Sequence, residues 1–361
     1  MKFDESSLYN IKSKLDGIRC SLYDLAIWKN GFAFKKIDFS ETGRPVIKIA
    51  ELNNGISSNT SFTQGNYSED VFIQWDDLLF SWSGNPKTSI DVFRYRLQDG
   101  WLNQHIFKVT ANEDLVTKDF LYYVLKFLKP HFTEIATNKQ TTGLGHVTIA
   151  DLKRMSLVVP LKEVQNQIVS ILKAIDDKIE VNKNINDNLQ QQATAIFKSW
   201  FVDCTPFDGV APETWRDVTL EEITTLVSRG IAPKYSYDSE QTVINQKCIR
   251  NHMIDLSLAR THTPKVINEK WLRFGDLLIN STGDGTLGRA AQVWFQPKNL
   301  TVDSHVTIVR PANENLIFYI GLWGILHEKE IESLHTGSTG QTELPRDRVK
   351  AMELLLPENE T

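Results

Sequence analysis

The sequence of 361 residues repeats itself with a period near 200 residues. Three blocks recur in the same order, at offsets that stay between 197 and 200 residues. The paired blocks are WDDLLFSWSGNPKTS and FGDLLINSTGDGTLG, LNQHIFKV and VDSHVTIV, and TTGLGHVTIADLKRMSLVVP and STGQTELPRDRVKAMELLLP. Chance similarity explains one short apolar match but hardly three collinear ones. The repeat therefore predicts two copies of one domain, at residues 1–160 and 207–361, with a segment of different character at 161–206 between them.

The segment between the copies has the pattern of one long helix. Residues 161–203 contain neither Gly nor Pro, and their apolar residues recur at spacings of three and four. This spacing places one apolar stripe on a helix of about 60 Å, and such a stripe needs a second helix to cover it, as in a coiled coil. Asn182 and Asn186 interrupt the stripe, where polar side chains can set the register against a partner. The stripe predicted to contact a partner helix consists of Val164, Ile168, Ile171, Ile175, Ile179, Leu189 and Ile196.

Each copy combines short strands with one helix. Runs typical of strands, such as Asp77–Trp82 and Leu277–Ile279, are separated by loops rich in Gly, Asn, Ser and Thr. A helical stretch follows at Lys118–Leu128 in the first copy and at Glu314–His327 in the second. We therefore expect an α+β fold, in which two homologous domains of mixed short strands and helices are joined by a long coiled-coil-type helix.

The composition is that of a folded, water-soluble chain. Apolar residues make up 41% and charged residues 24%, and the N-terminus lacks the apolar stretch of a signal peptide. No run approaches eighteen apolar residues, so no membrane contact is expected. Three dispersed cysteines provide no disulfide framework, which favours the reducing cytoplasm. The net charge of -5 excludes a polycation but not a local DNA-binding patch, because residues 1–160 carry 19 basic and 18 acidic side chains, and residues 207–361 carry 16 and 21.

The motifs that catalysis requires are incomplete. The string GDGTLG at 283–288 satisfies GxGxxG but precedes a strand-like run, which indicates a turn and not a dinucleotide site, and no Walker loop is present. His327 begins an HExxH motif, but Ile331 stands where the second His is required. Of the adjacent carboxylates only Asp77 recurs, as Asp276, at a strand entrance where Asp commonly closes a turn. The sequence therefore predicts a non-catalytic chain with no metal site.

The recurring loops are rich in small hydrogen-bond donors, aromatic residues and isolated bases. Ser, Thr and Asn can position phosphates, while Gln, Lys and Arg can address phosphates or base edges, although ordinary polar surface loops have a similar composition. His105 and His305, at matching strand positions, are interpreted as hydrogen-bonded structural residues. The residues predicted to contact DNA are Trp82, Ser83, Asn85, Lys87, Lys139, Gln140, Thr141 and Thr142 in the first copy, and Ser281, Thr282, Asp284, Thr286, Arg289, Ser338, Thr339 and Gln341 in the second.

The chain resembles the specificity subunits of type I restriction–modification systems over nearly its whole length. The resemblance rests on DLLFSWSGNPKTSID, GWLNQHIFKV and KQTTGLGHVTIADLK in the first copy, on IDDKIEVNKNIN and FKSWFVD in the helix, and on GDLLINSTGDGTLG in the second copy. Each string alone is weak evidence, but together they are specific. The resemblance implies that each copy is a target-recognition domain, which reads one half of a bipartite sequence in double-stranded DNA.

The same resemblance implies partners and cofactors. Antiparallel conserved helices dock two methyltransferase (modification) subunits, which carry S-adenosylmethionine and methylate adenine. A restriction/translocase subunit that uses ATP and Mg²⁺ joins the complex for cleavage. None of these cofactors is expected on this chain.

One departure from the family concerns the second long helix. The helix at 161–206 follows Pro160, whereas only four residues follow Pro357. The stripe on the first helix therefore lacks its partner within this sequence, and self-association through the unpaired helix is expected.

Two other functions stay open from the residues. A recognition chain for another restriction type, with a methyltransferase–nuclease partner, uses the same DNA-binding design, and the partner that co-purifies distinguishes it. A glycosidase-type enzyme would need a recurring pair of carboxylates, which the sequence lacks.

Overall fold

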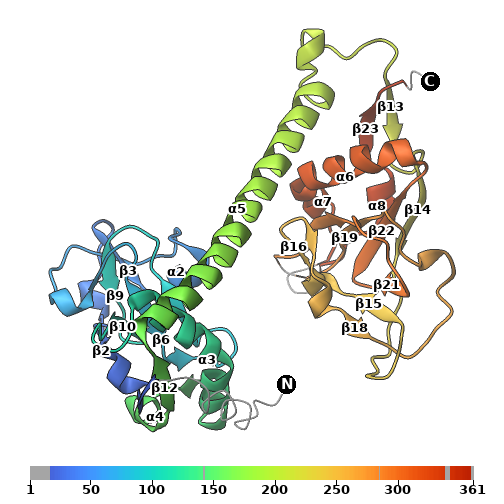
Figure 1. Ribbon diagram of the computed structural model, residues 1–361. Coiled ribbons are helices and arrows are strands. Elements are labelled where there is room, and N and C mark those ends of the chain that lie inside the picture. Colours follow the sequence, from blue (N-terminus) through green and yellow to red (C-terminus); the bar gives the residue numbers. More distant parts are fainter. Residues whose placement is uncertain (1–16, 141–142, 284, 338–341, 359–361) are drawn as a thin grey trace. The chain divides into compact units, whose positions relative to one another are not determined.

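The computed structural model describes residues 17–140, 143–283, 285–337 and 342–358, which fold into two compact units (Figure 1). Unit 1 is Met1–Asn182 and unit 2 is Lys183–Thr361. Both units combine short strands with helices, so the predicted α+β fold is confirmed. No helix among the described residues is long and apolar enough to cross a membrane.

Unit 1 is built on two four-stranded sheets. One sheet has the order β2-β10-β6-β8 and is antiparallel throughout; the other has the order β4-β3-β9-β5, in which β3 and β9 run parallel. The strands are β1 (Gly17–Ser21), β2 (Ala26–Asn30), β3 (Arg44–Ile47), β4 (Phe62–Thr63), β5 (Phe72–Ile73), β6 (Leu78–Ser81), β7 (Ser83–Gly84), β8 (Asp91–Arg94), β9 (Gly100–Leu102), β10 (Ile106–Ala111), β11 (Gly145–His146) and β12 (Ser156–Pro160). The helices are α2 (Ile49–Asn54), α3 (Lys118–Asn138) and α4 (Ile149–Arg154).

Side-chain alternation along β6 divides the unit into two cores. Leu78 and Phe80 face a large cluster that includes the buried side of α3, whereas Leu79 faces a smaller cluster against the second sheet. Both faces of this strand are buried, which explains its continuous apolar sequence.

Helix α3 is longer than the sequence predicted. The expected helix ended at Leu128, before Pro130, but α3 continues to Asn138. Leu128, Phe132 and Ala136 are all buried at a spacing of four, so packing against the core outweighs the loss of one backbone hydrogen bond at the proline.

Unit 2 repeats this architecture. Its central sheet has the order β14-β22-β19-β20, antiparallel like β2-β10-β6-β8, and β15 runs parallel to β21 as β3 does to β9. The strands are β13 (Arg216–Thr219), β14 (Thr224–Arg229), β15 (Thr242–Ile244), β16 (Ile249–Arg250), β17 (Met253–Ile254), β18 (Arg260–Thr261), β19 (Leu277–Asn280), β20 (Ala290–Gln292), β21 (Leu300–Val302), β22 (Val306–Pro311) and β23 (Glu353–Leu356). The helices are α6 (Ile317–Leu326), α7 (Glu328–Ser333) and α8 (Arg346–Lys350).

The pairing registers show which positions correspond. In unit 1 Phe80 lies opposite Phe107, and in unit 2 Ile279 lies opposite Thr307. The same register places Asn30 opposite Phe107 and Arg229 opposite Thr307. The repeated sequence blocks therefore occupy corresponding strands, and the ends of these strands can be compared residue by residue.

The long helix α5 (Lys162–Phe201) begins in unit 1 and ends in unit 2. Gln165 and Val169 pack into unit 1, while the aromatic ring of Phe197 is buried in the core of unit 2. Each end of the helix therefore supplies side chains to a different core, and the division of the chain at 161–206 stays a prediction from the sequence.

Candidate nucleic-acid interface

Strands β2 and β14 end at corresponding positions, each followed by a glycine. A Cβ on Gly31 would lie 2.1 Å from the carbonyl oxygen of Asn103, and one on Gly230 would lie 2.0 Å from that of Val302. Only glycine fits this close backbone approach. Each unit therefore brings the last residue of this strand, Asn30 or Arg229, beside the loops predicted to bind DNA.

In unit 1 this region centres on Trp82. Its indole Nε1 donates to Oδ1 of Asn30 at 3.0 Å, and its ring stacks on Phe107 with a centroid separation of 5.5 Å. The imidazoles of His105 and His146 lie 5.9 and 6.0 Å from the same ring. Trp82 is half-buried, so it supports the loop and still presents part of its surface to a ligand.

Ser83 does not present its hydroxyl to the surface. Its side chain is 5% exposed, and Oγ lies 2.9 Å from Nδ1 of His146. The hydroxyl joins β7 to β11, and the predicted contact of Ser83 with DNA stays a prediction.

The loop after β7 presents its polar side chains outward. Asn85 accepts the backbone N–H of Lys87 through Oδ1 at 3.0 Å, a turn that fixes the loop. Both side chains are exposed, and no ion pair of Lys87 occurs among the described residues. These two residues are well placed to reach a ligand.

Lys139, predicted to contact DNA, forms an ion pair in this structure. Its Nζ lies 2.5 and 2.6 Å from the two carboxylate oxygens of Asp151. Burial opposes ionisation of this carboxyl, but the hydrogen bonds from Lys139 and Thr148 outweigh it and lower the pKa of Asp151. Gln140 next to it is exposed, whereas Thr141 and Thr142 lie outside the described residues.

In unit 2, Ser281 takes the place of Trp82 and is fully buried. Its hydroxyl lies 2.6 Å from that of Thr307, which replaces Phe107. A hydrogen-bonded pair here replaces the stacked rings of unit 1, and the predicted contact of Ser281 with DNA stays a prediction.

Thr282 and His305 form a polar pair at the same edge. The threonine hydroxyl lies 2.9 Å from Nδ1 of His305 and 3.1 Å from Oε1 of Gln246. His305 is thus hydrogen-bonded, as the sequence predicted, and Gln246 is a member of the cluster that sequence reasoning missed.

The loop between β19 and β20 is a hairpin connection, in line with the turn predicted for GDGTLG. Thr286 donates its hydroxyl to the carbonyls of Thr282 and Gly283, each at 3.2 Å, and Arg289 donates Nη2 to the Gly285 carbonyl at 2.7 Å. Both side chains stabilise the loop while remaining partly exposed. The other predicted contacts of this copy, Asp284, Ser338, Thr339 and Gln341, lie outside the described residues.

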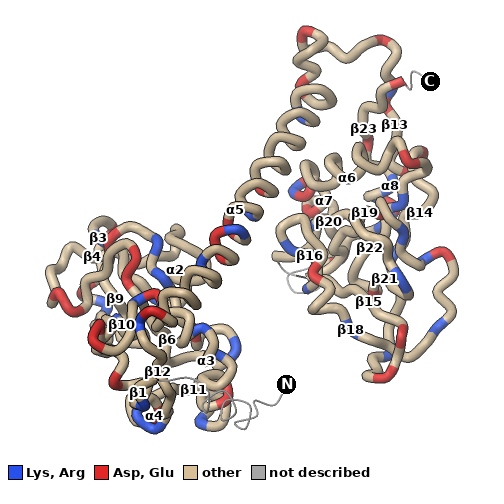
Figure 2. The backbone as a smooth tube through the Cα atoms, viewed as in Figure 1, with Lys and Arg blue, Asp and Glu red and all other residues tan. Residues whose placement is uncertain are grey.

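Lys and Arg positions alternate with Asp and Glu positions along the chain of both units (Figure 2). A nucleic-acid interface on this chain therefore depends on local groups of cations, not on a general basic surface.

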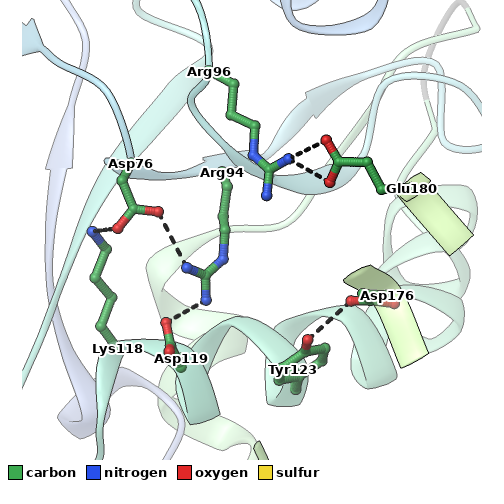
Figure 3. Close-up of polar contacts among 8 residues, drawn as sticks. All are labelled: Asp76, Arg94, Arg96, Lys118, Asp119, Tyr123, Asp176 and Glu180. Atoms are coloured by element: carbon green, nitrogen blue, oxygen red, sulfur yellow. Dashed lines mark hydrogen bonds and ion pairs between the residues drawn. The ribbon is translucent and has the colours of Figure 1, made fainter. Parts of the chain in front are cut away.

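A network of ion pairs stiffens unit 1 on the side where α5 lies (Figure 3). Arg94 bridges Asp76, at 3.1 Å, and Asp119, at 2.5 Å, and Lys118 reaches the other oxygen of Asp76 at 2.7 Å. Burial of the Asp76 carboxyl acts to raise its pKa, but the two cations lower it on balance. The network connects the turn before β6, the end of β8 and the first turn of α3.

Two contacts extend this network to the long helix. Arg96 donates Nη1 to both carboxylate oxygens of Glu180, at 3.0 and 2.8 Å, and Tyr123 donates its hydroxyl to Asp176 at 2.9 Å (Figure 3). Burial, together with the bond to Asp176, raises the pKa of Tyr123. The polar side of α5 is thereby held to unit 1.

The apolar stripe of α5 lies beside this polar side. Val164 and Ile168 are half-buried, and Ile168 packs on the core of unit 1. The rest of the predicted stripe is exposed by half or more of each side chain: Ile171, Ile175, Ile179, Leu189 and Ile196. So long a row of exposed apolar residues is typical of a surface that a partner covers.

Comparison with known proteins finds a similar family over the first half of the chain. Residues 20–191 match the family model "Type I restriction modification DNA specificity domain". The chain is 32% identical over 148 residues to the type I restriction enzyme HindI specificity subunit of Haemophilus influenzae, covering 39% of this chain and 32% of that protein. It is 24% identical over 226 residues to the type I restriction enzyme MjaIX specificity subunit of Methanocaldococcus jannaschii, and this match covers 56% of this chain and 50% of that protein.

A solved structure shows the same fold. The crystal structure of the S subunit of a type I restriction–modification system from M. genitalium matches with a TM-score of 0.54 at 15% identity, covering 96% of this chain and 86% of that one. Residues 20–191, which cover most of unit 1 and part of α5, are therefore similar to a type I restriction–modification DNA specificity domain. The sequence matches span about a third and a half of the length of the two curated relatives.

Proposed function

We propose that this chain is the DNA-specificity subunit of a type I restriction–modification complex, without catalytic activity of its own. One observation carries the proposal: the fold presents the same loop cluster twice, at the ends of corresponding strands, with different side chains in the two copies. Trp82 and Phe107 in unit 1 are replaced by Ser281 and Thr307 in unit 2. One architecture with two sets of side chains suits the recognition of two different half-sites in double-stranded DNA.

The other parts of the complex follow as proposals from the family. Methyltransferase subunits supply S-adenosylmethionine and methylate adenine, and a restriction/translocase subunit supplies ATP- and Mg²⁺-dependent cleavage. The complex acts in the cytoplasm, where the DNA is. The specificity chain itself binds none of these cofactors in this proposal.

Within the two loop clusters, we propose Lys87, Gln140 and Arg289 as the principal described contacts with DNA. Lys139 contacts DNA only if it exchanges its partner Asp151 for a phosphate. Trp82, Asn85, Thr282 and Thr286 complete the proposed surface, and Thr141, Thr142, Asp284, Ser338, Thr339 and Gln341 remain proposals from the sequence.

Replacing Lys87 or Arg289 with alanine is expected to weaken binding to random-sequence duplex DNA. Each change should reduce the slope of log affinity against log salt concentration by about 1, since one phosphate contact releases about one counterion. Fluorescence anisotropy at several salt concentrations measures this. The matched control is Lys183→Ala on the exposed surface of α5, which should leave the slope unchanged. Unchanged binding in both loop variants would place the interface elsewhere.

The exposed stripe of α5 is proposed to pack against a helix of another molecule. In the absence of other subunits, we expect the chain to self-associate at micromolar concentration, because a long row of exposed isoleucines is poorly tolerated by a monomer. Light scattering should give a mass above that of one chain, 41.3 kDa. The double variant Ile175→Lys, Ile179→Lys should shift the mass to the monomer; a monomeric wild-type chain would contradict the proposal.

A further inference from the structure

Unit 2 contains an open pocket of about 490 Å³ next to the loop cluster. Its wall includes three cations from distant parts of the sequence: Arg229 at the end of β14, Lys270 at the end of the turn Asn268–Lys270, and Arg346 at the start of α8. The hydroxyl-bearing residues Ser228 and Thr336 also line it, and two carboxylates, Glu343 and Asp347, stand in the wall beside the cations. Glu343, which forms backbone bridges with Thr282 and Thr336, connects the pocket to the loops already described.

Arg229 is fixed in the wall of the pocket. Its Nη1 is paired with Glu343, and its Nη2 donates to the carbonyl of Leu344 at 2.8 Å. Burial and the positive charge of Arg346 lower the pKa of Arg229, so the two guanidinium groups act on the same small volume.

The other two cations, Lys270 and Arg346, have weaker hydrogen-bond and ion-pair partners than Arg229. Lys270 donates Nζ to the carbonyl of Gly230 at 3.2 Å, and none of the ion pairs among the described residues includes it. Arg346 is 62% exposed, and its one carboxylate neighbour, Asp347, is 82% exposed at 3.6 Å. A solvated pair of this kind contributes little, so both cations are available to an anion.

Among the described residues of unit 1, the three corresponding positions carry no cation. Asn30 ends the strand that corresponds to β14, Val71 ends the turn that corresponds to Asn268–Lys270, and Ile149 begins the helix that corresponds to α8. Three cations thus converge only in the copy that is acidic overall, with 16 basic and 21 acidic residues in 207–361. A general excess of basic residues does not explain them.

We propose that this pocket binds one backbone phosphate of the DNA and so sets the position of unit 2 on the duplex. The inference rests on the proposed DNA-recognition function and adds a site particular to unit 2. Arg229, held by Glu343, forms the fixed wall, and Lys270 and Arg346 close on the phosphate. A phosphate contact fixes orientation without reading bases, so the contribution should be independent of DNA sequence.

The experiment compares the full chain with the double variant Lys270→Ala, Arg346→Ala on a random-sequence duplex. Fluorescence anisotropy between about 50 and 200 mM KCl should show roughly tenfold weaker binding and a salt slope smaller by about 1 in the double variant. The control is Arg348→Ala, on the same short helix but outside the pocket, whose guanidinium donates to the Leu334 carbonyl. Its salt slope should equal that of the wild-type chain.

A variant that is expected to bind DNA more tightly distinguishes loss of the phosphate site from misfolding of the chain. Glu343→Gln removes a negative charge from the pocket and should tighten DNA binding, a result that a misfolded chain cannot give. Wild-type affinity and slope in the double variant, or no tightening in Glu343→Gln, would overturn the phosphate site while DNA recognition stands. If the wild-type chain fails to bind duplex DNA, the proposed function falls, and this inference with it.

A last measurement, with inorganic phosphate, tests whether the pocket binds DNA phosphate or only the free anion. If inorganic phosphate raises the unfolding temperature of the wild-type chain but not that of the double variant, and both bind DNA equally, the pocket is a free-anion site and the inference is wrong.

Discussion

Replacing Arg310 with methionine is expected to lower the free energy of unfolding of unit 2 by about 3–5 kcal/mol. The guanidinium donates Nε and Nη2 to the two carboxylate oxygens of Asp276, at 2.8 and 2.7 Å. The remaining donors bond the carbonyls of Glu269 and Trp271 at 2.8 and 2.7 Å. With Arg310 and Asp276 only 6% and 1% exposed, removal of the arginine leaves a buried carboxylate without its counter-ion.

Hydrogen exchange of the β19 and β22 amides under native conditions measures this change within unit 2, together with denaturant unfolding of the whole chain. The matched comparison is Lys108→Met in unit 1, which breaks the pair with Asp77 at 3.1 Å, where the side chains are 22% and 26% exposed, and should cost about 1 kcal/mol or less. The double variant Arg310→Met, Asp276→Leu should recover part of the loss, because it removes both buried charges. A single variant as stable as the wild type would show that the pair contributes nothing.

Replacing Gln165 with alanine is expected to destabilise unit 1 by about 2–4 kcal/mol. This side chain is fully buried near the start of α5. Its Oε1 accepts the N–H of Thr117 at 2.9 Å, and its Nε2 donates to the carbonyls of Leu115 and Pro160, both at 2.8 Å. The substitution leaves three backbone groups without their partner and loosens the junction between β12, α3 and the long helix.

The control for this change lies two residues further along the same helix. Gln167 is exposed, so Gln167→Ala should change the stability of unit 1 by no more than about 0.5 kcal/mol. Exchange of the β10 and α3 amides reports on unit 1 alone. Equal exchange rates in the two variants would mean that water replaces the amide of Gln165 at no cost.

The repeat predicted most of the fold because corresponding strands keep both their apolar pattern and their turn residues. Asp77 and Asp276 close the turns before β6 and β19, as expected, each by accepting a backbone N–H at 2.8 Å. The sequence underestimated α3, since the burial of Phe132 and Ala136 is decided by the sheet against which they pack. It also could not show that α5 is held through its polar side, because Glu180 and its partner Arg96 are 84 residues apart.

The candidate interface was predicted less well than the fold. Ser83 and Ser281 belong to polar loops, but hydrogen bonds with His146 and Thr307 bury them. Arg229 was missed because its partner Glu343 lies 114 residues away. Comparison of position 107 with position 307, once the repeat is aligned, would have indicated that positions 82 and 281 pack differently in the two copies.

The antiparallel pairs at the base of each unit have a consequence for how such chains change. Gly17 pairs with Pro160 and Arg216 with Leu356, so the segments 17–160 and 216–356 each begin and end at neighbouring points. A segment with adjacent ends can be exchanged as a block without disturbing what precedes or follows it. If the proposed function holds, exchange of such a segment by recombination between related genes changes one proposed half-site in a single event and leaves the connecting helix unchanged.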